Sequence, residues 1–312
     1  MATILCIMTM TASVRVALLS QWIKPSSEDE KEQQDRAERM VRDAIEARPI
    51  LKDVDKRIYT KGSYPNNTNV RRDSDVDVVV QLHECSYYDY KAGVTPPASS
   101  PGGKYPGIWT PTLWRAEVNQ ALVDTFGSAS VDTRGKIATE VSAVAGSRPS
   151  ADVVPSFLYY RYDDAARTSF EQGSCVFPSN GGAKIVNWPE QQLTKGRAKN
   201  VSSSQRYKSY VRALKNAENT LAAAGTTNDL PSYFMECLVF NVPDATLKTG
   251  TLDKGFQETL RWLYLRLDDG TAYGDWVEPN WCKWLFKGVQ KWTVDDAKTL
   301  VLKTWNYLGY TN

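Results

Sequence analysis

Residues 61–81 read KGSYPNNTNVRRDSDVDVVVQ, and this stretch decides the fold. Asp75 and Asp77 stand two positions apart at the start of a valine-rich run that is typical of a β-strand. Because successive side chains of a strand alternate between its two faces, both carboxylates should point the same way. Two carboxylates on one face repel each other unless a cation lies between them, and oxygen ligands alone suit Mg²⁺ or Mn²⁺. The stretch therefore predicts a metal site at the start of a strand.

Two flanking features sharpen this prediction. Ser63 stands twelve residues before Asp75, directly after Gly62. A glycine lets the backbone approach a phosphate, and the serine hydroxyl can donate to it. Asp152 opens another valine-rich piece, DVVP. If the two strands are neighbours, three carboxylates converge: two would hold metals, and the third could also accept the proton of an attacking hydroxyl. This arrangement is typical of two-metal phosphoryl transfer, which needs no histidine.

Three features also have a simpler structural explanation. A bare D-x-D pair is more often a polar strand end on a solvated face, but Gly-Ser upstream and DVVP downstream favour the metal site. His83, just after the Asp75 strand, is expected to be a polar strand-end residue, with a substrate contact as the alternative. Six of the ten tryptophans lie between Trp262 and Trp305. Most of these six are expected in a helical core rather than as platforms for nucleobases.

The composition limits the chemistry further. The 312-residue chain contains one histidine, so a His-pair zinc site cannot form within one chain. Its five cysteines are odd in number and widely spaced, with no C-x-x-C, so neither a zinc ribbon nor a disulfide framework is indicated. A net charge of +2 gives no global bias toward nucleic acid or membrane. We therefore expect a reduced, cytoplasmic protein that uses carboxylates, hydroxyls and lysines.

The N-terminal residues 1–19 are fairly apolar and need a separate check. Their first basic residue is Arg15, whereas a signal peptide carries its charge before the apolar run. Threonine and serine interrupt the run, so a membrane span is not expected. Met8 and Met10 are alternatives to Met1 as the first residue. We expect a ragged end that leads into a helix.

Hydrophobic spacing predicts the order of the elements. A capping box at Ser27 and Glu30 should begin a long amphipathic helix that ends near Pro49. Strands are expected at 57–59, 76–82, 137–143 and 151–158, helices at 113–126, 203–224 and 231–238, and a loop at 93–107. The C-terminal third should be helical and aromatic. This order predicts an α+β protein with a smaller sheet lobe and a larger helical lobe.

The segment 184–215 is locally basic. It holds eight basic residues against the single acid Glu190: Lys184, Lys195, Arg197, Lys199, Arg206, Lys208, Arg212 and Lys215. A positive stretch facing a carboxylate-metal cluster would suit nucleoside triphosphates. The alternative is a solvated helix face that balances acids elsewhere. Nucleic-acid binding is the weaker interpretation, because the nearby aromatic residues have the spacing of a helix core.

Together these residues resemble a known family. Gly-Ser, D-x-D and a distant third aspartate are similar to the DNA polymerase β-like nucleotidyltransferases. The string GSYPNNTNVRRDSDVDVVV resembles the bacterial cGAS/DncV-like enzymes (CD-NTases), which make cyclic oligonucleotide second messengers in anti-phage (CBASS) signalling. WIKPSS at 22–27, ADVVP at 151–155, IVNWPE at 185–190 and PSYFMECLVFNVP at 231–243 agree with that subgroup. The resemblance extends over residues 19–310.

The resemblance implies the fold and its domains. We expect a polymerase β-like nucleotidyltransferase lobe, a mixed sheet flanked by helices, packed on a C-terminal helical lobe, with a long N-terminal spine helix. Residues 1–200 would form the catalytic lobe together with the N-terminal helix. Residues 201–312 would form the helical lobe that completes the nucleotide cleft.

The resemblance also implies the roles of the acids and of the Gly-Ser pair. Asp75, Asp77 and Asp152 would be the catalytic triad and the ligands of two Mg²⁺ or Mn²⁺ ions. Gly62 and Ser63 would contact the triphosphate of the donor nucleotide.

Three further residues would bind the same nucleotide. By resemblance, Lys215 and Ser232 would grip the triphosphate and Tyr233 would stack on a base. Lys208 and Arg212 lie on the same predicted helix as Lys215 and are alternatives to it.

The expected activity is metal-dependent synthesis of a cyclic di- or oligonucleotide from ATP, GTP or both. A ribose hydroxyl would attack an α-phosphate and release pyrophosphate, and a second such step would close the ring. The expected partners are an effector that senses the product and a regulatory protein, without membrane or stably bound nucleic acid. The alternatives are transfer to an RNA, protein or small-molecule acceptor, or a non-catalytic nucleotide- or RNA-binding module on the same fold. The sequence leaves base choice, linkage, ring size, activation and oligomeric state open.

Overall fold

The computed structural model describes residues 10–70, 75–98, 105–270, 273–288 and 290–311. Outside this part lie Met1 and Met8, two of the alternative first residues, and residues 71–74 of the stretch 61–81. The chain forms two compact units. The helical unit comprises Met1–Ser26, Asn66–Val70 and Gln191–Asn312, and the sheet unit comprises Ser27–Pro65 and Arg71–Glu190. This division by contacts differs from a single boundary after residue 200, because the N-terminal helix and a short inner segment pack with the C-terminal helices.

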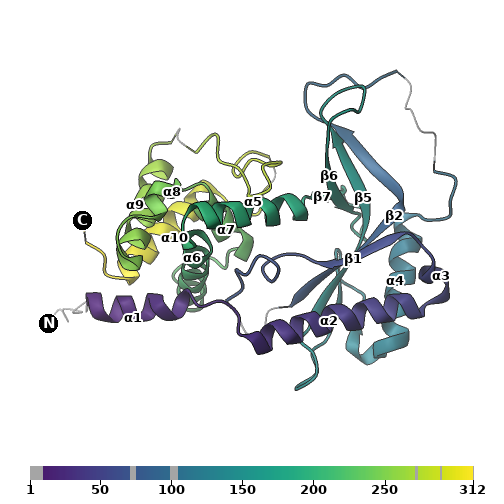
Figure 1. Ribbon diagram of the computed structural model, residues 1–312, viewed down its shortest axis with the longest axis horizontal. Helices are drawn as coiled ribbons and strands as arrows, with labels where there is room; N and C mark the ends of the chain where they lie inside the picture. Colours follow the sequence, from purple (N-terminus) through teal and green to yellow (C-terminus); the bar gives the residue numbers. More distant parts are fainter. Residues whose placement is uncertain (1–9, 71–74, 99–104, 271–272, 289, 312) are drawn as a thin grey trace. The chain divides into compact units, whose positions relative to one another are not determined.

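The sheet unit is built on one mixed sheet, whose central pair is β2 (Val76–Tyr90) and β5 (Ala151–Tyr162) (Figure 1). These two strands run parallel, and the other neighbours are antiparallel. The flanking strands are β1 (Lys56–Thr60), β3 (Val131–Asp132), β4 (Thr139–Val141), β6 (Phe170–Val176) and β7 (Ile185–Asn187). Valine-rich stretches occupy the central pair because a strand that is covered on both faces has to be apolar throughout.

Helices of the sheet unit pack on this sheet. The long helix α2 (Glu28–Ala47) contacts β1 and β2, and α4 (Pro111–Phe126) contacts β3, β4 and β5. Both halves of the predicted capping box are present: the Ser27 backbone N–H donates to Glu30, and the Glu30 N–H donates to Ser27 Oγ. The short elements α3 (Pro49–Lys52) and η1 (Ser128–Ser130) follow these two helices.

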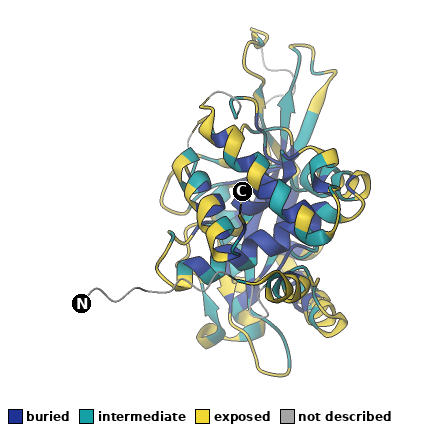
Figure 2. Cartoon of the chain, turned by 90° about the vertical axis from the view of Figure 1, so that its left-hand side faces the viewer, coloured by how far each residue is buried: buried dark blue, intermediate teal, exposed yellow. Residues whose placement is uncertain are grey.

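The helical unit forms around α6 (Arg206–Ala223) and α7 (Ser232–Phe240), which contribute more residues to its large apolar core than any other pair of helices. Buried residues, dark blue in Figure 2, line the inner faces of its helices. The remaining helices are α1 (Ala12–Trp22), α5 (Pro189–Ser202), α8 (Asp244–Leu247), α9 (Leu252–Asp268) and α10 (Val294–Tyr307). No helix in the described part of the chain is both long and apolar enough to cross a membrane.

The α+β class and most predicted elements are confirmed, with differences at three places. The predicted strand 76–82 is longer than expected and continues to Tyr90. A bulge after Leu82 interrupts its pairing with β5, and the pairing resumes at Ser86. His83 therefore lies inside β2, and its prediction as a strand-end residue is wrong. The helix α5 and the strands β3, β6 and β7 were not predicted: the hydrophobic spacing of α5 is weak, and β3 and β7 are only two and three residues long.

The prediction that the C-terminal tryptophans form a core holds for most of them. Trp276 and Trp292 are buried and Trp262 and Trp305 pack against the same core, whereas Trp281 and Trp284 are exposed. Both exposed side chains belong to one loop between α9 and α10.

Candidate active site

The parallel pairing of β2 and β5 brings two of the predicted acids together. Asp77 is directly opposite Asp152 in the register, and antiparallel pairing with β4 sets Glu140 opposite Asp152 on the other side. Residues that face each other across neighbouring strands share one face of the sheet. Three carboxylates from three strands therefore lie in a row, and Glu140 is a member that the sequence analysis missed. The alternation of Thr139, Glu140 and Val141 was the available signal.

Asp75 lies just before this row, at the exposed start of β2. Its carboxylate accepts a hydrogen bond from the Ser150 hydroxyl, and Ser150 directly precedes β5. The Lys61 ammonium is 3.9 Å from Asp77 Oδ1. With these partners, no three acidic, histidine or cysteine side chains in the described residues are close enough to hold a metal ion. The backbone brings the acids together, and their carboxylates point to local partners.

Ionisation of the acids in this row is unfavourable. The pKa of Asp152 is raised to about 6, mainly by burial and then by the charges of Asp75, Asp77 and Glu140. Burial also raises the pKa of Asp77, and Asp75 adds to this while Lys61 opposes it. Each raised pKa means that the folded protein holds a carboxylate where its charge is unfavourable. Perturbed acids of this kind are typical of functional sites.

Gly62 lies against the same acids. Its φ is +80°, and a Cβ atom at this position would come within 2.6 Å of Asp77 Oδ2. The backbone N–H of Lys61 donates to the Asp77 carbonyl at 3.0 Å. Only glycine allows this approach, because any other residue would combine left-handed strain with a clash. The structure thus brings the predicted pair Gly62 and Ser63 to the start of β2.

The chemical type of these donors suits a divalent cation, because they are carboxylate oxygens from neighbouring strands. Burial, and then the repulsion between the acids, raises the pKa values of Asp77 and Asp152, and a nearby positive charge would lower both. Gly62 itself adds no side chain at Asp77 Oδ2. In the arrangement described, the carboxylates of Asp75, Asp77 and Asp152 would have to turn toward one another to hold Mg²⁺ or Mn²⁺.

The residues predicted to grip a nucleotide from the helical unit have contrasting surroundings. Lys215 on α6 is 2% exposed, and its ammonium is 3.3 Å from Thr68 Oγ1. The Thr68 hydroxyl in turn donates to Glu236 Oε2 at 3.1 Å. Burial lowers the pKa of Lys215, and Glu236 opposes this effect. Thr68 and Glu236 were not predicted: Glu236 interrupts the apolar run 234–240, which was an available signal, whereas Thr68 lies in a polar stretch that gave none.

Ser232 and Tyr233 begin α7. Ser232 is exposed, and Tyr233 is half-buried. The Tyr233 hydroxyl donates to Glu278 Oε2 at 3.2 Å and accepts from Asn280 Nδ2 at 3.3 Å. The Tyr233 ring lies edge-on to Trp292, with 6.4 Å between the ring centroids. These two residues are adjacent to each other at one helix start, as the resemblance implied.

The two alternatives to Lys215 on α6 are both buried. The Arg212 guanidinium donates to the backbone carbonyls of Ile23 and Asn67. Lys208 is also buried. In the sheet unit, Lys184 pairs with Asp89 at 2.8 Å. The basic stretch 184–215 is therefore not one solvated face, since several of its charges hold the fold together.

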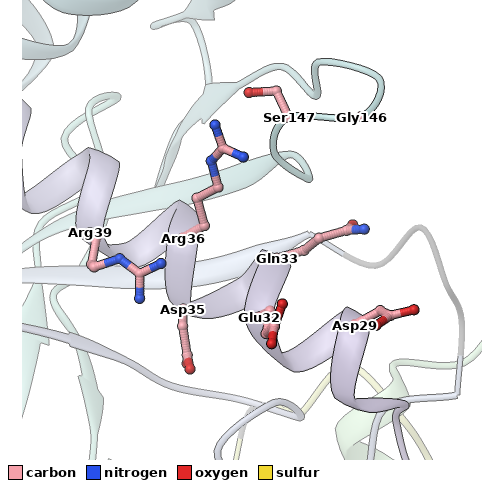
Figure 3. Close-up of a pocket in the computed structure, with 8 residues that line it drawn as sticks. All are labelled: Asp29, Glu32, Gln33, Asp35, Arg36, Arg39, Gly146 and Ser147. Carbon is pink, nitrogen blue, oxygen red and sulfur yellow. The ribbon is translucent and has the colours of Figure 1, made fainter.

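One hollow of the sheet unit is lined by residues other than the predicted acids. It has a volume of about 660 Å³ and lies between α2 and the turn at Gly146 and Ser147 (Figure 3). Its other lining residues come from α2 and carry charges of both signs: Asp29, Glu32, Gln33, Asp35, Arg36 and Arg39. None of the predicted site residues lines it.

A mixed sheet that presents paired carboxylates beside a Gly-Ser turn defines a nucleotidyltransferase. The model of the cGAS/DncV-like nucleotidyltransferase C-terminal helical domain matches residues 194–309. A cyclic dipyrimidine nucleotide synthase of Legionella pneumophila is 37% identical over 291 residues, 92% of this chain and 96% of that relative. The chain therefore belongs to the cGAS/DncV-like nucleotidyltransferases.

Other relatives and solved structures agree. A cyclic dipurine nucleotide synthase of Elizabethkingia meningoseptica is 33% identical over 81% of this chain and 85% of the relative. The solved structure of a cyclic dinucleotide synthase from that organism, with GTP and Apcpp, has a TM-score of 0.77 at 28% identity and covers 94% of this chain and 98% of its own. The Rhodothermus marinus c-UMP-AMP synthase, with Apcpp and Upnpp, also has a TM-score of 0.77, at 27% identity, over 92% of this chain and 94% of its own.

Proposed function

We propose that this enzyme joins nucleoside triphosphates into a cyclic di- or oligonucleotide. The observation that carries the proposal is the register of β2 and β5, which sets Asp77 opposite Asp152 beside the turn at Gly62. The relatives named above are cyclic nucleotide synthases. The products of these relatives differ in base. ATP and GTP remain the expected substrates, and CTP and UTP have to be tested alongside them.

Each residue of the site has a proposed part in the reaction. Gly62 and Ser63 bind the donor triphosphate through the backbone and the Ser63 hydroxyl. Asp75, Asp77 and Asp152 hold two Mg²⁺ or Mn²⁺ ions. When bound, these ions supply positive charge that stabilises the phosphates and lowers the pKa of an attacking hydroxyl.

Asp152 is the proposed proton acceptor. A ribose hydroxyl oxygen forms a bond to the α-phosphorus, the bond from that phosphorus to the pyrophosphate oxygen breaks, and the hydroxyl proton passes to the Asp152 carboxylate. In the metal-free protein, burial and then like charges raise the pKa of Asp152 to about 6, which makes it a stronger base than an ordinary aspartate; bound cations would lower this pKa. The second, ring-closing step repeats the same transfers on the linear intermediate.

Three residues of the helical unit are also proposed to bind a nucleotide. The exposed hydroxyl of Ser232 would donate to the triphosphate, and Tyr233 would stack on a base. Lys215 would have to exchange its contact with Thr68 Oγ1 for a phosphate oxygen. A cytoplasmic location, an effector that senses the product, a regulatory protein and a role in anti-phage signalling complete the proposal.

The test is incubation of the purified protein with all four nucleoside triphosphates and Mg²⁺ or Mn²⁺, with products analysed by mass spectrometry. We expect a product that resists phosphatase and single-strand nuclease. A linear product attached to an added RNA, protein or small molecule would instead favour another acceptor. Nucleotide binding that is equal with and without divalent metal, and without any product, would favour a non-catalytic binding module.

A further inference from the structure

The loop between α9 and α10 holds a tryptophan in an unusual position. Trp281 is 64% exposed, although its ring is among the largest apolar surfaces a side chain can have. Its φ is +60°, in the left-handed region that bulky residues rarely adopt. Such strain persists only where the surrounding structure enforces it, and it is concentrated at functional sites.

The loop enforces this conformation through a tight set of hydrogen bonds. The backbone N–H of Trp281 donates to the Glu278 carbonyl at 2.9 Å, and the Glu278 N–H donates to the Lys283 carbonyl at 2.9 Å. The side-chain oxygen of Asn280 accepts from the backbone N–H groups of Cys282 at 2.7 Å and Lys283 at 3.1 Å. Trp281 is thus presented to solvent by a built turn.

This turn rests directly on Tyr233. Glu278 and Asn280 are each 4% exposed, and both bond to the Tyr233 hydroxyl. The Asn280 amide also donates to Glu278 Oε2 at 2.8 Å. The exposed indole therefore belongs to the same hydrogen-bonded turn that contacts the residue proposed to stack on a base.

A cation accompanies the exposed indole. The Lys195 ammonium, from α5, lies 4.4 Å from the centroid of the Trp281 ring. A flat aromatic surface next to a positive charge can make two contacts with a nucleotide: the ring stacks on the base and the ammonium pairs with the phosphates. Lys195 is half-buried, so its stem is supported while its head can reach a ligand.

We propose that Trp281 and Lys195 bind a nucleoside triphosphate substrate, with Trp281 stacking on the base and Lys195 contacting the phosphates. This inference rests on the proposed function and extends its nucleotide site beyond Ser232 and Tyr233. Trp284 of the same loop is a matched control. It is 46% exposed and has the Lys287 ammonium 4.0 Å from its ring, but its backbone pairs with Val277 in a β-bridge and carries no positive φ.

The test compares W281A, W281F and W284A for KM and kcat with each nucleoside triphosphate. Loss of one base–aromatic stack should raise KM about fivefold or more in W281A. We expect kcat to stay within about twofold, because stacking supports binding rather than the transfer step. W281F keeps an aromatic face and should restore most of the affinity, while W284A should resemble the wild type. K195Q should raise KM and make it less sensitive to salt.

Two outcomes overturn the inference. One is an unchanged KM in W281A while the wild type makes product. The other is an equal rise in W284A, which would assign the effect to the loop as a whole. Calorimetric titration of ATP, GTP, CTP and UTP into the same variants separates this inference from the proposed function. If the wild type makes no product but nucleotide binding still depends on Trp281, the proposed function fails and the nucleotide contact stands.

Discussion

The two units treat their charged groups in opposite ways. In the sheet unit, Asp77 and Asp152 are brought together by backbone register, and burial and like charge make their ionisation unfavourable. In the helical unit, Glu236 and Lys215 are almost fully buried but are joined through Thr68, so each has a partner. The first arrangement is electrostatically unfavourable by itself, whereas in the second each buried charge is compensated within the fold. The acids of the sheet unit are therefore assigned to the proposed reaction, and the buried charges of the helical unit to stability. Substitutions in each unit test this distinction.

The largest expected effect comes from removing acids of the sheet unit. The double variant D75A/D77A should lower product formation by about a thousandfold or more, because it removes the groups that organise charge at the reacting phosphate. Product measured by mass spectrometry checks this. D89N, an exposed acid on the same strand paired with Lys184, is the control and should keep near-normal activity. Activity retained in the double variant would disprove the site assignment.

Replacing one of the same acids should stabilise the metal-free protein, whereas most substitutions destabilise a protein. D152N removes a carboxylate whose charged form is disfavoured by burial and by three like charges. We expect the metal-free variant to unfold at a higher denaturant concentration than the wild type while it loses activity. Loss of both properties would mean that Asp152 supports the fold.

The next largest effect is expected from a substitution at Gly62, which lies close to Asp77. G62A adds a Cβ atom 2.6 Å from Asp77 Oδ2 at a φ of +80°. It should lower activity by at least about tenfold and the free energy of unfolding by about 1–2 kcal/mol. Gly93 is the matched control, since its φ is +89° and a Cβ there would meet nothing within 4 Å. If G93A and G62A lose equal activity, backbone strain alone explains the result and the contact with Asp77 is irrelevant.

The helical unit should respond in the opposite direction to a carboxylate replacement. E236Q leaves Lys215 buried without its opposing charge and weakens the acceptor for Thr68 and Gln192. We expect the free energy of unfolding to fall by about 1–3 kcal/mol, measured by urea denaturation. The double variant K215M/E236Q should recover part of this loss, because no unpaired charge remains. A stabilising effect of E236Q would remove the distinction between the two units.

The sequence predicted these two regions to different depths, for physical reasons. The period of two along residues 75–82 placed Asp75 and Asp77 on one face, and DVVP marked a second strand for Asp152. The register that sets Asp77 opposite Asp152, and that adds Glu140, is a long-range choice which no local pattern encodes. In the helical unit the apolar spacing predicted α6 and α7. Polar contacts inside that core depend on how helices meet, so Thr68 and Glu236 could not be paired from spacing.

The smallest expected effect is a pH dependence of the melting temperature, which again differs between the two units. The folded pKa of Asp152 is raised to about 6 from an ordinary 3.8, so folding favours its protonated form. This contribution to stability is complete below pH 4 and is lost as the pH rises through about 6. Without divalent metal, the melting temperature of the wild type should therefore fall over this interval by more than that of D152N. With Mg²⁺ the difference should shrink, because a cation stabilises the ionised acids and binds more tightly above pH 6. Melting curves at pH 4.5 to 7.5, with Mg²⁺ or with a chelator, check both parts. E236Q is the control, because Glu236 lies in the other unit, and it should shift every curve without changing this pH difference.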